Sequence, residues 1–458
     1  MPDSAVRSAG QPRWAGDAAL AAVAASLTVV TALWVGNHGL TDLVAGLGPA
    51  LTSLGRLAGL VSADLLLVQV LAMSRVPWVE RAFGQDRLAR WHRLLGFTSF
   101  SLVLGHIALV TLGYAATART GVATQLWDLV VTYPGMLLAT AGTGLLVLVV
   151  VTSVRAARRR LRYESWHLLH LYAYLGVGLA LPHQLWTGSE LVSSPAARAY
   201  WWSVYLVTLG AVLAFRVGLP VYRTLRHRPV VTAVVDEAPG VVSLHLAGRD
   251  LHRLPVRAGQ FFVWRFLTGA GWTRGHPFSL SAVPHPGLLR ITVKDLGDGS
   301  GALAGVRPGT RAVIEGPYGA LTAQRRTRPA VTLLASGIGI TPLRALLEEL
   351  DLPPGAVTLL YRAGDDSDLV FGAELDALVH ARGARVVRLL GHRAGAGSWL
   401  PAALGHLGDA EALRLLVPGI ERQDVFVCGP EPWMDAALSA LAAAGVPSGQ
   451  VHVERFAW

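Results

Sequence analysis

The sequence predicts a multidomain membrane protein, in which a bundle of six membrane-spanning helices precedes a soluble half with a β-rich domain and an α/β domain. Three observations lead to this fold class. Of the 458 residues, 52% are hydrophobic and only 15% are charged, a balance typical of membrane proteins. The long apolar segments all lie before residue 221. Beyond it, short β-like runs alternate with Gly/Pro turns and then with helical patterns.

Six segments are long and apolar enough to be spanning helices. They are residues 17–36, 50–73, 93–114, 134–153, 167–186 and 200–220. The polar residues before the first segment show no clear cleavage-site pattern, so we expect an uncleaved anchor.

Arginines predict the orientation of this bundle. They gather in residues 74–93, 155–162 and 221–228, whereas the alternate loops contain two arginines in all. Basic loops normally face the cytoplasm. We therefore expect a multi-pass protein of the cytoplasmic membrane with both termini and the soluble half in the cytoplasm. The same rule explains the net charge of +10 without a nucleic-acid partner.

Two of the apolar segments carry paired histidines, although polar groups are costly in hydrocarbon. His92 and His106 belong to the third segment, and His170 and His183 to the fifth. Each pair spans roughly 20 Å of helix. Because both helices run outward, His92 and His170 share the inner level, and the other two share the outer level. Facing imidazoles can clamp haem iron, bind another metal or relay protons. His167, one turn from His170, competes for the inner position.

The β-rich stretch, residues 228–325, carries two motifs that suit a flavin nucleotide. "GHPFSLS", residues 275–281, places an aromatic ring and a small hydroxyl where they can pack on a flavin and hydrogen-bond it. "KDLGDGSG", residues 294–301, has glycines that let backbone amides approach a pyrophosphate. The candidate cofactor-binding residues here are His276, Pro277, Phe278, Ser279, Lys294, Gly299 and Ser300.

The α/β region begins with a buried strand that runs into Gly337 and Gly339, after which Thr341 and Pro342 open a helix. Proline is favourable in a first helical turn, and a helix N-terminus attracts phosphate. The turn is not the GxGxxG fingerprint. Ligands of such folds bind at the carboxyl ends of the parallel strands.

Two further strand ends carry candidate residues. Arg362 follows the "VTLLYR" strand, where it either contacts an adenosine 2′-phosphate or is solvated. The "DVFVCGP" strand ends on Cys428, Gly429 and Pro430, which suit a nicotinamide pocket, although Cys428 also reads as a small buried residue. As the only cysteine, it excludes internal disulfides and cysteine-ligated iron–sulfur clusters.

Together these motifs resemble the bacterial NADPH oxidase / ferric reductase-like transmembrane flavocytochromes, over nearly the whole chain from residue 15. The resemblance implies a ferric reductase-like domain at 1–220, an FAD-binding antiparallel β-barrel at 221–326 and an NAD(P)H-binding α/β domain of ferredoxin–NADP reductase type at 327–458. It implies two b haems, ligated by His92 with His170 and by His106 with His183.

Two further residues match the family by position. Arg56 corresponds to an arginine beside the outer haem, although it also reads as an interfacial residue that snorkels. An aromatic residue at the C-terminus covers the flavin in this family. Phe456 is the favoured counterpart, but the chain continues to Trp458, which leaves both open.

The resemblance implies electron transfer from NADPH or NADH through FAD and the two haems to an acceptor outside. Oxygen, which would yield superoxide, is favoured, while a ferric chelate and a partner protein stay open. A histidine-bearing transporter is the non-enzymatic alternative, and it would need no flavin module. The sequence requires no partner protein.

Overall fold

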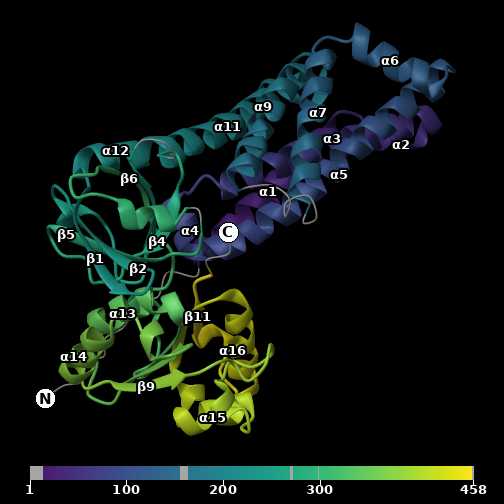
Figure 1. Cartoon of the computed structure of the whole chain (residues 1–458). Coiled ribbons are helices and arrows are strands. Elements are labelled where there is room, and N and C mark those ends of the chain that lie inside the picture. Colours follow the sequence, from purple (N-terminus) through teal and green to yellow (C-terminus); the bar gives the residue numbers. More distant parts are fainter. Residues whose placement is uncertain (1–13, 155–162, 269–271, 298, 456–458) are drawn as a thin grey trace, which may run out of the picture. The chain divides into compact units, whose positions relative to one another are not determined.

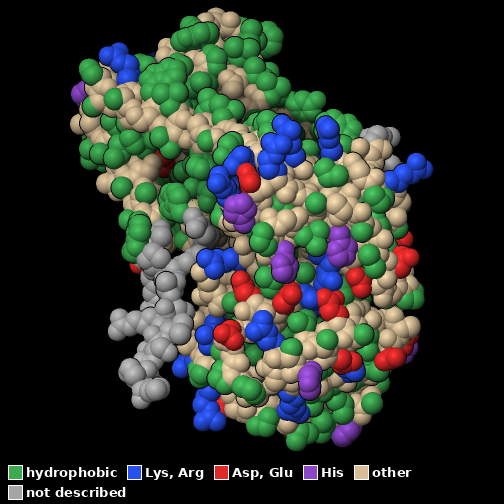
Figure 2. Space-filling model, turned by 90° about the vertical axis from the view of Figure 1, so that its left-hand side faces the viewer, with side chains coloured by type: hydrophobic (Ala, Val, Ile, Leu, Met, Phe, Trp, Pro, Cys, Tyr) green, Lys and Arg blue, Asp and Glu red, His purple; other side chains and the backbone are tan. Residues whose placement is uncertain are grey.

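The computed structural model describes residues 14–154, 163–268, 272–297 and 299–455. They form two compact units, one helical over Trp14–Arg216 and one from Val217 onward that contains the β-sheets (Figure 1). Figure 2 shows hydrophobic side chains over the helical unit, whereas charged side chains are scattered over the sheet-containing unit.

The helical unit follows the predicted order of spans. Its helices are α1 (Trp14–Gly36), α2 (Gly39–Val44), α3 (Leu47–Ala72), α4 (Pro77–Phe83), α5 (Gln85–Ala118), α6 (Val122–Thr132), α7 (Met136–Ser153), α9 (Tyr163–Thr187), α10 (Ser189–Val192) and α11 (Pro195–Ala211). A π-helical stretch, Val212–Gly218, leads from α11 into α12 (Leu219–His227).

Five helical segments within the described ranges are long and apolar enough to cross a membrane. They are Gly16–Gly36, Leu47–Ala72, Arg87–Ala118, Met136–Ser153 and Pro195–His227. The remaining predicted span coincides with α9, which is helical over 25 residues. Its histidines, Pro182 and Gln184 lower its mean hydropathy, so a sixth crossing stays a prediction.

Glycines let neighbouring helices of this unit approach closely. α3 packs along α5, and α7 packs along α9. A Cβ on Gly48 would lie 2.2 Å from Thr117 Oγ1, and one on Gly142 would lie 2.5 Å from the carbonyl oxygen of Gly176. Small residues commonly serve this purpose between membrane helices. As a result, α3 and α7 support α5 and α9, the two helices that carry the paired histidines.

The β-rich region forms two antiparallel sheets of three strands each, β1-β2-β5 and β4-β3-β6. The strands are β1 (Val230–Ala238), β2 (Val241–Ala247), β3 (Phe261–Phe266), β4 (His276–Ser279), β5 (Leu288–Lys294) and β6 (Ala312–Tyr318). Inward-facing residues of both sheets, among them Leu244, Phe262, Trp264 and Ile291, share one fully buried core. The strands pair antiparallel, as predicted, but they are divided between two three-stranded sheets.

The α/β region is a five-stranded parallel sheet with the order β11-β10-β7-β8-β9. Its elements are β7 (Val331–Ser336), α13 (Ile340–Glu349), β8 (Val357–Ala363), α14 (Gly372–Arg382), β9 (Arg385–Leu390), α15 (Asp409–Leu416), β10 (Asp424–Cys428), α16 (Glu431–Ala443) and β11 (Val451–Val453). α13 packs in one core and α16 in another, on the two faces of the sheet. The strand order reverses between β7 and β10, which creates a switch point where ligands bind in such folds.

Candidate functional site

The four predicted histidine ligands meet in two pairs. The ring centroids of His92 and His170 lie 5.8 Å apart, and those of His106 and His183 lie 6.4 Å apart. A metal ion about 2.0–2.1 Å from one nitrogen of each ring places the two centroids roughly 6 Å apart. The spacing of both pairs therefore fits one ion per pair.

Each pair supplies two protein ligands. In the described part of the chain, no group of three or more His, Cys, Asp and Glu side chains is arranged to hold a metal ion. A six-coordinate ion between two imidazoles would take its other ligands from a macrocycle, as haem iron does. The donor set thus fits bis-histidine haem.

Both histidines of α5 are oriented by carbonyl groups of α3. His106 Nδ1 lies 2.8 Å from the Gly55 oxygen, and His92 Nδ1 lies 3.4 Å from the Gln69 oxygen. A carbonyl oxygen only accepts hydrogen bonds, so Nδ1 carries the hydrogen in both rings. This tautomer leaves the Nε2 lone pair available for a metal, which is the usual arrangement of a ligating histidine.

The α9 histidines have hydroxyl partners at the same ring position. His183 Nδ1 lies 2.7 Å from Thr187 Oγ1, which itself donates to the His183 carbonyl. Since the single hydroxyl hydrogen is used there, Thr187 accepts from Nδ1–H. His170 Nδ1 lies 3.3 Å from Ser153 Oγ. All four rings are therefore held at Nδ1.

Arg56 occupies an ion-pair cluster close to the His106–His183 pair. It follows Gly55, the partner of His106, on α3. Its guanidinium donates to Glu190, to Asp42 Oδ2 at 3.2 Å and to the Asn37 carbonyl at 2.8 Å. Glu190 and Asp42 were missed by the sequence interpretation because they come from short helices between the spans.

The "HPFS" motif forms strand β4, which pairs with β3. The rings of His276 and Phe278 stack in parallel, 5.9 Å apart between centroids. Ser279 is buried, and its hydroxyl has no hydrogen-bond partner. An unsatisfied buried hydroxyl costs free energy, so it points to an absent partner. A flavin ring supplies such a partner, which makes this motif fit the predicted FAD.

The second flavin motif forms a turn after β5. The Ser300 hydroxyl accepts from the Leu296 amide at 2.8 Å, which closes the turn. A Cβ on Gly299 would lie 2.7 Å from the guanidinium carbon of Arg274, so a side chain here would displace the Arg274 guanidinium from the turn. Arg274 was not among the predicted residues. Lys294, which was predicted to bind cofactor, lies 3.6 Å from Asp368 in an ion pair.

The two predicted nicotinamide turns meet at the switch point of the parallel sheet. A Cβ on Gly339 would lie 2.3 Å from the Cys428 carbonyl oxygen, and one on Gly429 would lie 3.0 Å from Ser336 Cβ. Gly337 has a φ of 54°, which favours glycine. The two glycine turns, at Gly337–Gly339 and Gly429, thus pack closely at the carboxyl ends of β7 and β10 without side chains between them. We call this feature the nucleotide cradle, because ligands of such folds bind at this edge of the sheet.

Residues beside these turns have mainly conformational roles. Thr341 Oγ1 donates to the Ile338 carbonyl at 3.0 Å, and Pro342 lies in the first turn of α13. Pro430 precedes α16. Cys428 is fully buried, and burial raises the pKa of its thiol, so it stays neutral and is not a nucleophile.

Arg362 lies near the end of β8, and its side chain is half-buried. Its Nη2 donates to the Gly391 carbonyl at 3.0 Å, while its Nε is buried and without a partner. Burial and the nearby cation of Arg393 lower the pKa of Arg362. An unused guanidinium donor beside a second cation is an arrangement that can bind an anion. Arg393 was missed because it lies in a loop with no motif.

Phe456 and Trp458, the two candidates for a flavin cover, lie outside the described residues. The last described segment includes the buried Glu454, which accepts from the Ala320 amide at 3.2 Å. This contact ties the end of β11 to the residues after β6.

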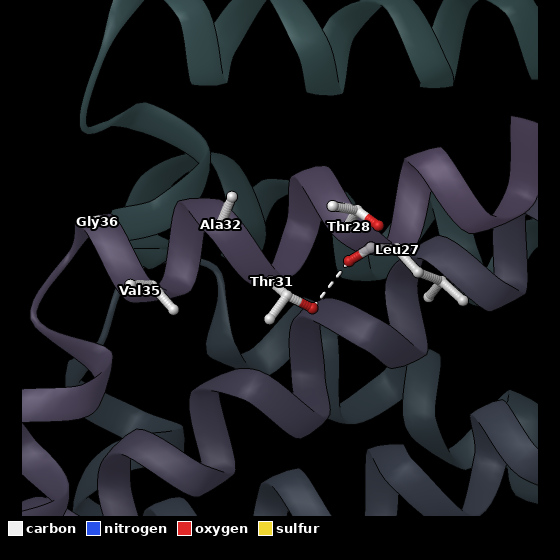
Figure 3. A pocket seen from close by; sticks show the side chains of 6 residues that line it. All are labelled: Leu27, Thr28, Thr31, Ala32, Val35 and Gly36. Carbon is white, nitrogen blue, oxygen red and sulfur yellow. Dashed lines mark hydrogen bonds between the residues drawn. The ribbon is translucent and has the colours of Figure 1, made fainter.

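A hollow on α1 lacks the histidines, charged groups and glycine turns of the sites described above. It is lined by Leu27, Thr28, Thr31, Ala32, Val35 and Gly36 (Figure 3). Both threonine hydroxyls are used within the helix, because Thr28 donates to the Ala24 carbonyl and Thr31 to the Leu27 carbonyl. The hollow therefore offers an apolar lining and no reactive group.

Comparison with known proteins agrees with this architecture. A family model described as "Ferric reductase like transmembrane component" matches residues 58–181. The ferredoxin reductase component of a 3-ketosteroid-9-alpha-monooxygenase from Mycobacterium tuberculosis is 34% identical over 239 residues, which are 49% of this chain and 64% of that protein. The chain thus spans less than two thirds of the length of that relative.

Two further matches each cover half of this chain. The ferredoxin–NAD(+) reductase component of an alkene monooxygenase system from Xanthobacter autotrophicus is 31% identical over 50% of this chain and 70% of that protein. The FAD/NAD-binding domain of a nitric oxide dioxygenase from Vibrio cholerae is 25% identical, covers 50% of this chain and 98% of its own, and superposes with a TM-score of 0.42.

The family predicted from the sequence motifs is confirmed, and relatives of this kind are oxidoreductases. The five apolar helices and the transmembrane component indicate a multi-pass membrane protein. The chain belongs to the ferric reductase-like transmembrane oxidoreductases that carry a ferredoxin–NADP reductase-type dehydrogenase domain.

Proposed function

We propose that the chain passes electrons from cytoplasmic NADPH through FAD and two b haems to an acceptor on the far side of the membrane. One observation carries this proposal: four histidine rings face each other in two pairs, and each ring is held at Nδ1. FAD supplies the exchange between two-electron and one-electron chemistry, and haem supplies single-electron transfer.

The histidine rings would hold the two haems at different depths. His92 and His170 form the inner site, and His106 and His183 form the outer site. This arrangement requires α9 to lie beside α5 as a sixth span. The 25 residues of α9 extend over about 37 Å, enough to cross a hydrocarbon core about 30 Å thick. The arginine-rich loops support a cytoplasmic dehydrogenase half, because basic loops normally face the cytoplasm; one of these loops, 155–162, lies outside the described residues.

The dehydrogenase residues divide between the two nucleotides. The Ser279 hydroxyl would donate to the flavin ring, and the turn at Gly299 and Ser300 would face the pyrophosphate of FAD, with Lys294 beside it. The cradle at Gly339 and Gly429 would receive NADPH. In this proposal the domains keep the predicted ranges 1–220, 221–326 and 327–458.

Two arginines favour NADPH over NADH: Arg362 near the end of β8 and Arg393 in the loop after β9. Arg362 has a buried, unused donor, and Arg393 lies near it. A 2′-phosphate would accept from both guanidinium groups, and charge-assisted bonds of this kind are strong. NADH has only a hydroxyl at that position.

The charges around Arg56 favour oxygen as the acceptor and superoxide as the product. Arg56 is paired with two carboxylates, those of Asp42 and Glu190. A cluster with one positive and two negative charges repels an anionic ferric chelate, whereas neutral oxygen meets no such barrier. A partner protein is the second candidate acceptor, because relatives of the dehydrogenase half are the reductase components of multicomponent oxygenases.

Absorption spectra of the purified full-length protein test the proposal. We expect flavin absorbance, b-type haem bands and reduction of both by NADPH under anaerobic conditions. His170→Ala should lose the inner haem, whereas the matched control His167→Ala should keep both. Superoxide and ferrous iron are then measured side by side with NADPH. Protein that binds no haem, or equal haem loss in His170→Ala and His167→Ala, would contradict the assignment.

A further inference from the structure

A partly buried network of charges joins the antiparallel β domain to the α/β domain. Arg290 on β5 binds Glu374 on α14 through two bonds, Nη1 to Oε2 and Nη2 to Oε1, each 3.1 Å long. Arg344 on α13 binds the same Glu374, and it also binds Glu348 one turn along its own helix. Glu348 accepts from the Val283 amide of the β domain at 2.8 Å. The bonds from Arg290 and from the Val283 amide thus connect the β domain to two carboxylates and one arginine of the α/β domain.

The two arginines of this network are shielded from water more than those of an ordinary surface ion pair. The side chain of Arg344 is 5% exposed and that of Arg290 is 11% exposed, while that of Glu374 is 31% exposed. The Arg290 guanidinium also lies over the ring of the buried Phe371, 4.8 Å from its centroid. Charges shielded from water are little screened by salt, and a bidentate Arg–carboxylate pair has a defined geometry. Lys294 and Asp368 form a second cross-domain pair, but it is longer, at 3.6 Å, and its cation is 34% exposed, so we expect it to contribute less.

The β-domain end of the network reaches the flavin motif. Arg290 Nε donates to Ser281 Oγ at 3.1 Å, and Nη2 donates to the Ser281 carbonyl at 2.8 Å. Ser281 lies two residues after Ser279. The buried Ser279 hydroxyl has no hydrogen-bond partner. Thr292 Oγ1 also donates to Ser281 Oγ at 2.8 Å. A shift of Arg290 is therefore transmitted to the end of β4.

The α/β end of the network reaches the nucleotide turn. Arg344 is fixed on α13, the helix that begins directly after Gly339 and contains Pro342 in its first turn. The helix is buried over most of its length. A displacement of Glu374 or Arg344 thus displaces the cradle as a whole relative to β4.

We propose that Glu374 is a positioning residue, which sets the approach of the nicotinamide to the flavin by holding Arg290 and Arg344 together. This inference rests on the proposed function, since it assumes that both nucleotides bind as described. Hydride transfer needs the reacting atoms in close contact, and a misplacement of about 1 Å can lower the rate about 100-fold. Glu374 touches neither nucleotide site directly and acts through the two arginines.

Flavin reduction by NADPH in the purified full-length protein tests this role. Glu374→Gln removes the charge but keeps the shape of the side chain. We expect flavin reduction to be about 10- to 100-fold slower, while flavin content and the KM for NADPH change little. Asp376→Asn is the matched control, because Asp376 lies on the same helix but is exposed and pairs only within its own domain, with Arg388. Arg290→Lys keeps the charge without the bidentate geometry and should lie between wild type and Glu374→Gln.

A distance measurement provides a readout that does not depend on activity. Spin labels at Asp236→Cys on β1 and Ser439→Cys on α16 occupy exposed positions of the two domains, and the native Cys428 is fully buried. We expect one narrow distance distribution in the otherwise unchanged protein and a broader one with Glu374→Gln. Broadening together with slow flavin reduction supports the proposal.

Two results would overturn it. The first is an unchanged distance distribution in Glu374→Gln. The second is a wild-type rate of flavin reduction in Glu374→Gln even though its distance distribution is broader or its thermal midpoint is lower. That result would assign Glu374 a purely structural role. Wild-type protein that contains no flavin would refute the proposed function instead. The network would then be judged on the distance distribution alone.

Discussion

The packing of Gly59 against His106 permits a sharp test of the outer haem site. Gly59 lies on α3, one turn after Gly55, whose carbonyl oxygen binds His106 Nδ1. A Cβ at position 59 would lie 2.7 Å from Nδ1 and 3.1 Å from Cε1 of His106. Gly59→Ala therefore places a methyl group against the ring at the very atom that α3 uses to orient it.

The size of the effect follows from these distances. Ordinary van der Waals contacts of a Cβ lie at 3.4–4 Å, so the methyl group is at least about 0.7 Å too close to Nδ1. Because α3 and α5 pack tightly at several glycines, the ring must tilt and its Nδ1 bond to Gly55 lengthens or breaks. Loss of a bond that orients a metal-binding histidine typically costs 10- to 100-fold in metal affinity, or about 1.4–2.7 kcal/mol. We expect Gly59→Ala to lower outer haem occupancy and to spare the inner haem.

Haem per protein in the purified variant, measured as pyridine haemochrome absorbance, gives the occupancy. Gly105→Ala is the matched control, because a Cβ at Gly105, the neighbour of His106, would have no heavy atom within 4 Å. This control should keep both haems. Full loading and unchanged spectra in folded Gly59→Ala would refute the placement of a haem between His106 and His183.

Three further outcomes are expected. Arg362→Ala should raise the KM for NADPH about 10-fold or more and leave that for NADH nearly unchanged, because only NADPH carries a 2′-phosphate. Ser279→Ala should retain flavin but shift its absorption spectrum and slow its reduction, since it removes the one buried hydroxyl of the motif that has no protein partner. Asp424→Asn should lower the thermal midpoint of the dehydrogenase half near pH 7, with the loss shrinking towards pH 3.

The pH dependence follows from the surroundings of Asp424. Burial alone raises its pKa, but bonds from His452 and from the amides of Thr327 and Arg328 outweigh burial and hold the pKa below its ordinary value. The carboxylate therefore stabilises the fold above pH about 3.9, and this contribution is lost as the pH falls through the lowered pKa. Bonds to a charged group contribute about 1.5–3 kcal/mol each at most. A constant difference between wild type and Asp424→Asn from pH 7 to pH 3 would contradict this account.

Controls separate these effects from general loss of stability. Arg388→Ala removes another arginine of the same sheet, on β9, and should leave the ratio of the two KM values unchanged. An equal rise of both KM values in Arg362→Ala would show that Arg362 does not recognise the phosphate. An unchanged flavin spectrum in Ser279→Ala would remove this hydroxyl from the flavin site.

The sequence by itself determined the features that depend on local pattern. Apolar runs about 20 residues long identified the spanning segments, because a helix of that length matches the hydrocarbon core. Glycines at strand ends identified the nucleotide turns, since only a bare backbone can approach another turn as Gly339 approaches Cys428. The α9 segment was the least clear of the spans, because its predicted metal ligands, His170 and His183, also lower its mean hydropathy.

The tertiary structure alone decided which groups meet. Helical spacing could place His167 or His170 at the inner level, and only the packing of α9 turns the ring of His170 toward His92. The carbonyl groups that orient the α5 histidines come from α3, and Arg393 approaches Arg362 from another loop. The Arg290–Glu374 pair joins residues 84 positions apart. The physical reason is the same throughout: periodicity encodes the face on which a residue lies, whereas its partner is set by the packing of distant segments, which no local pattern records.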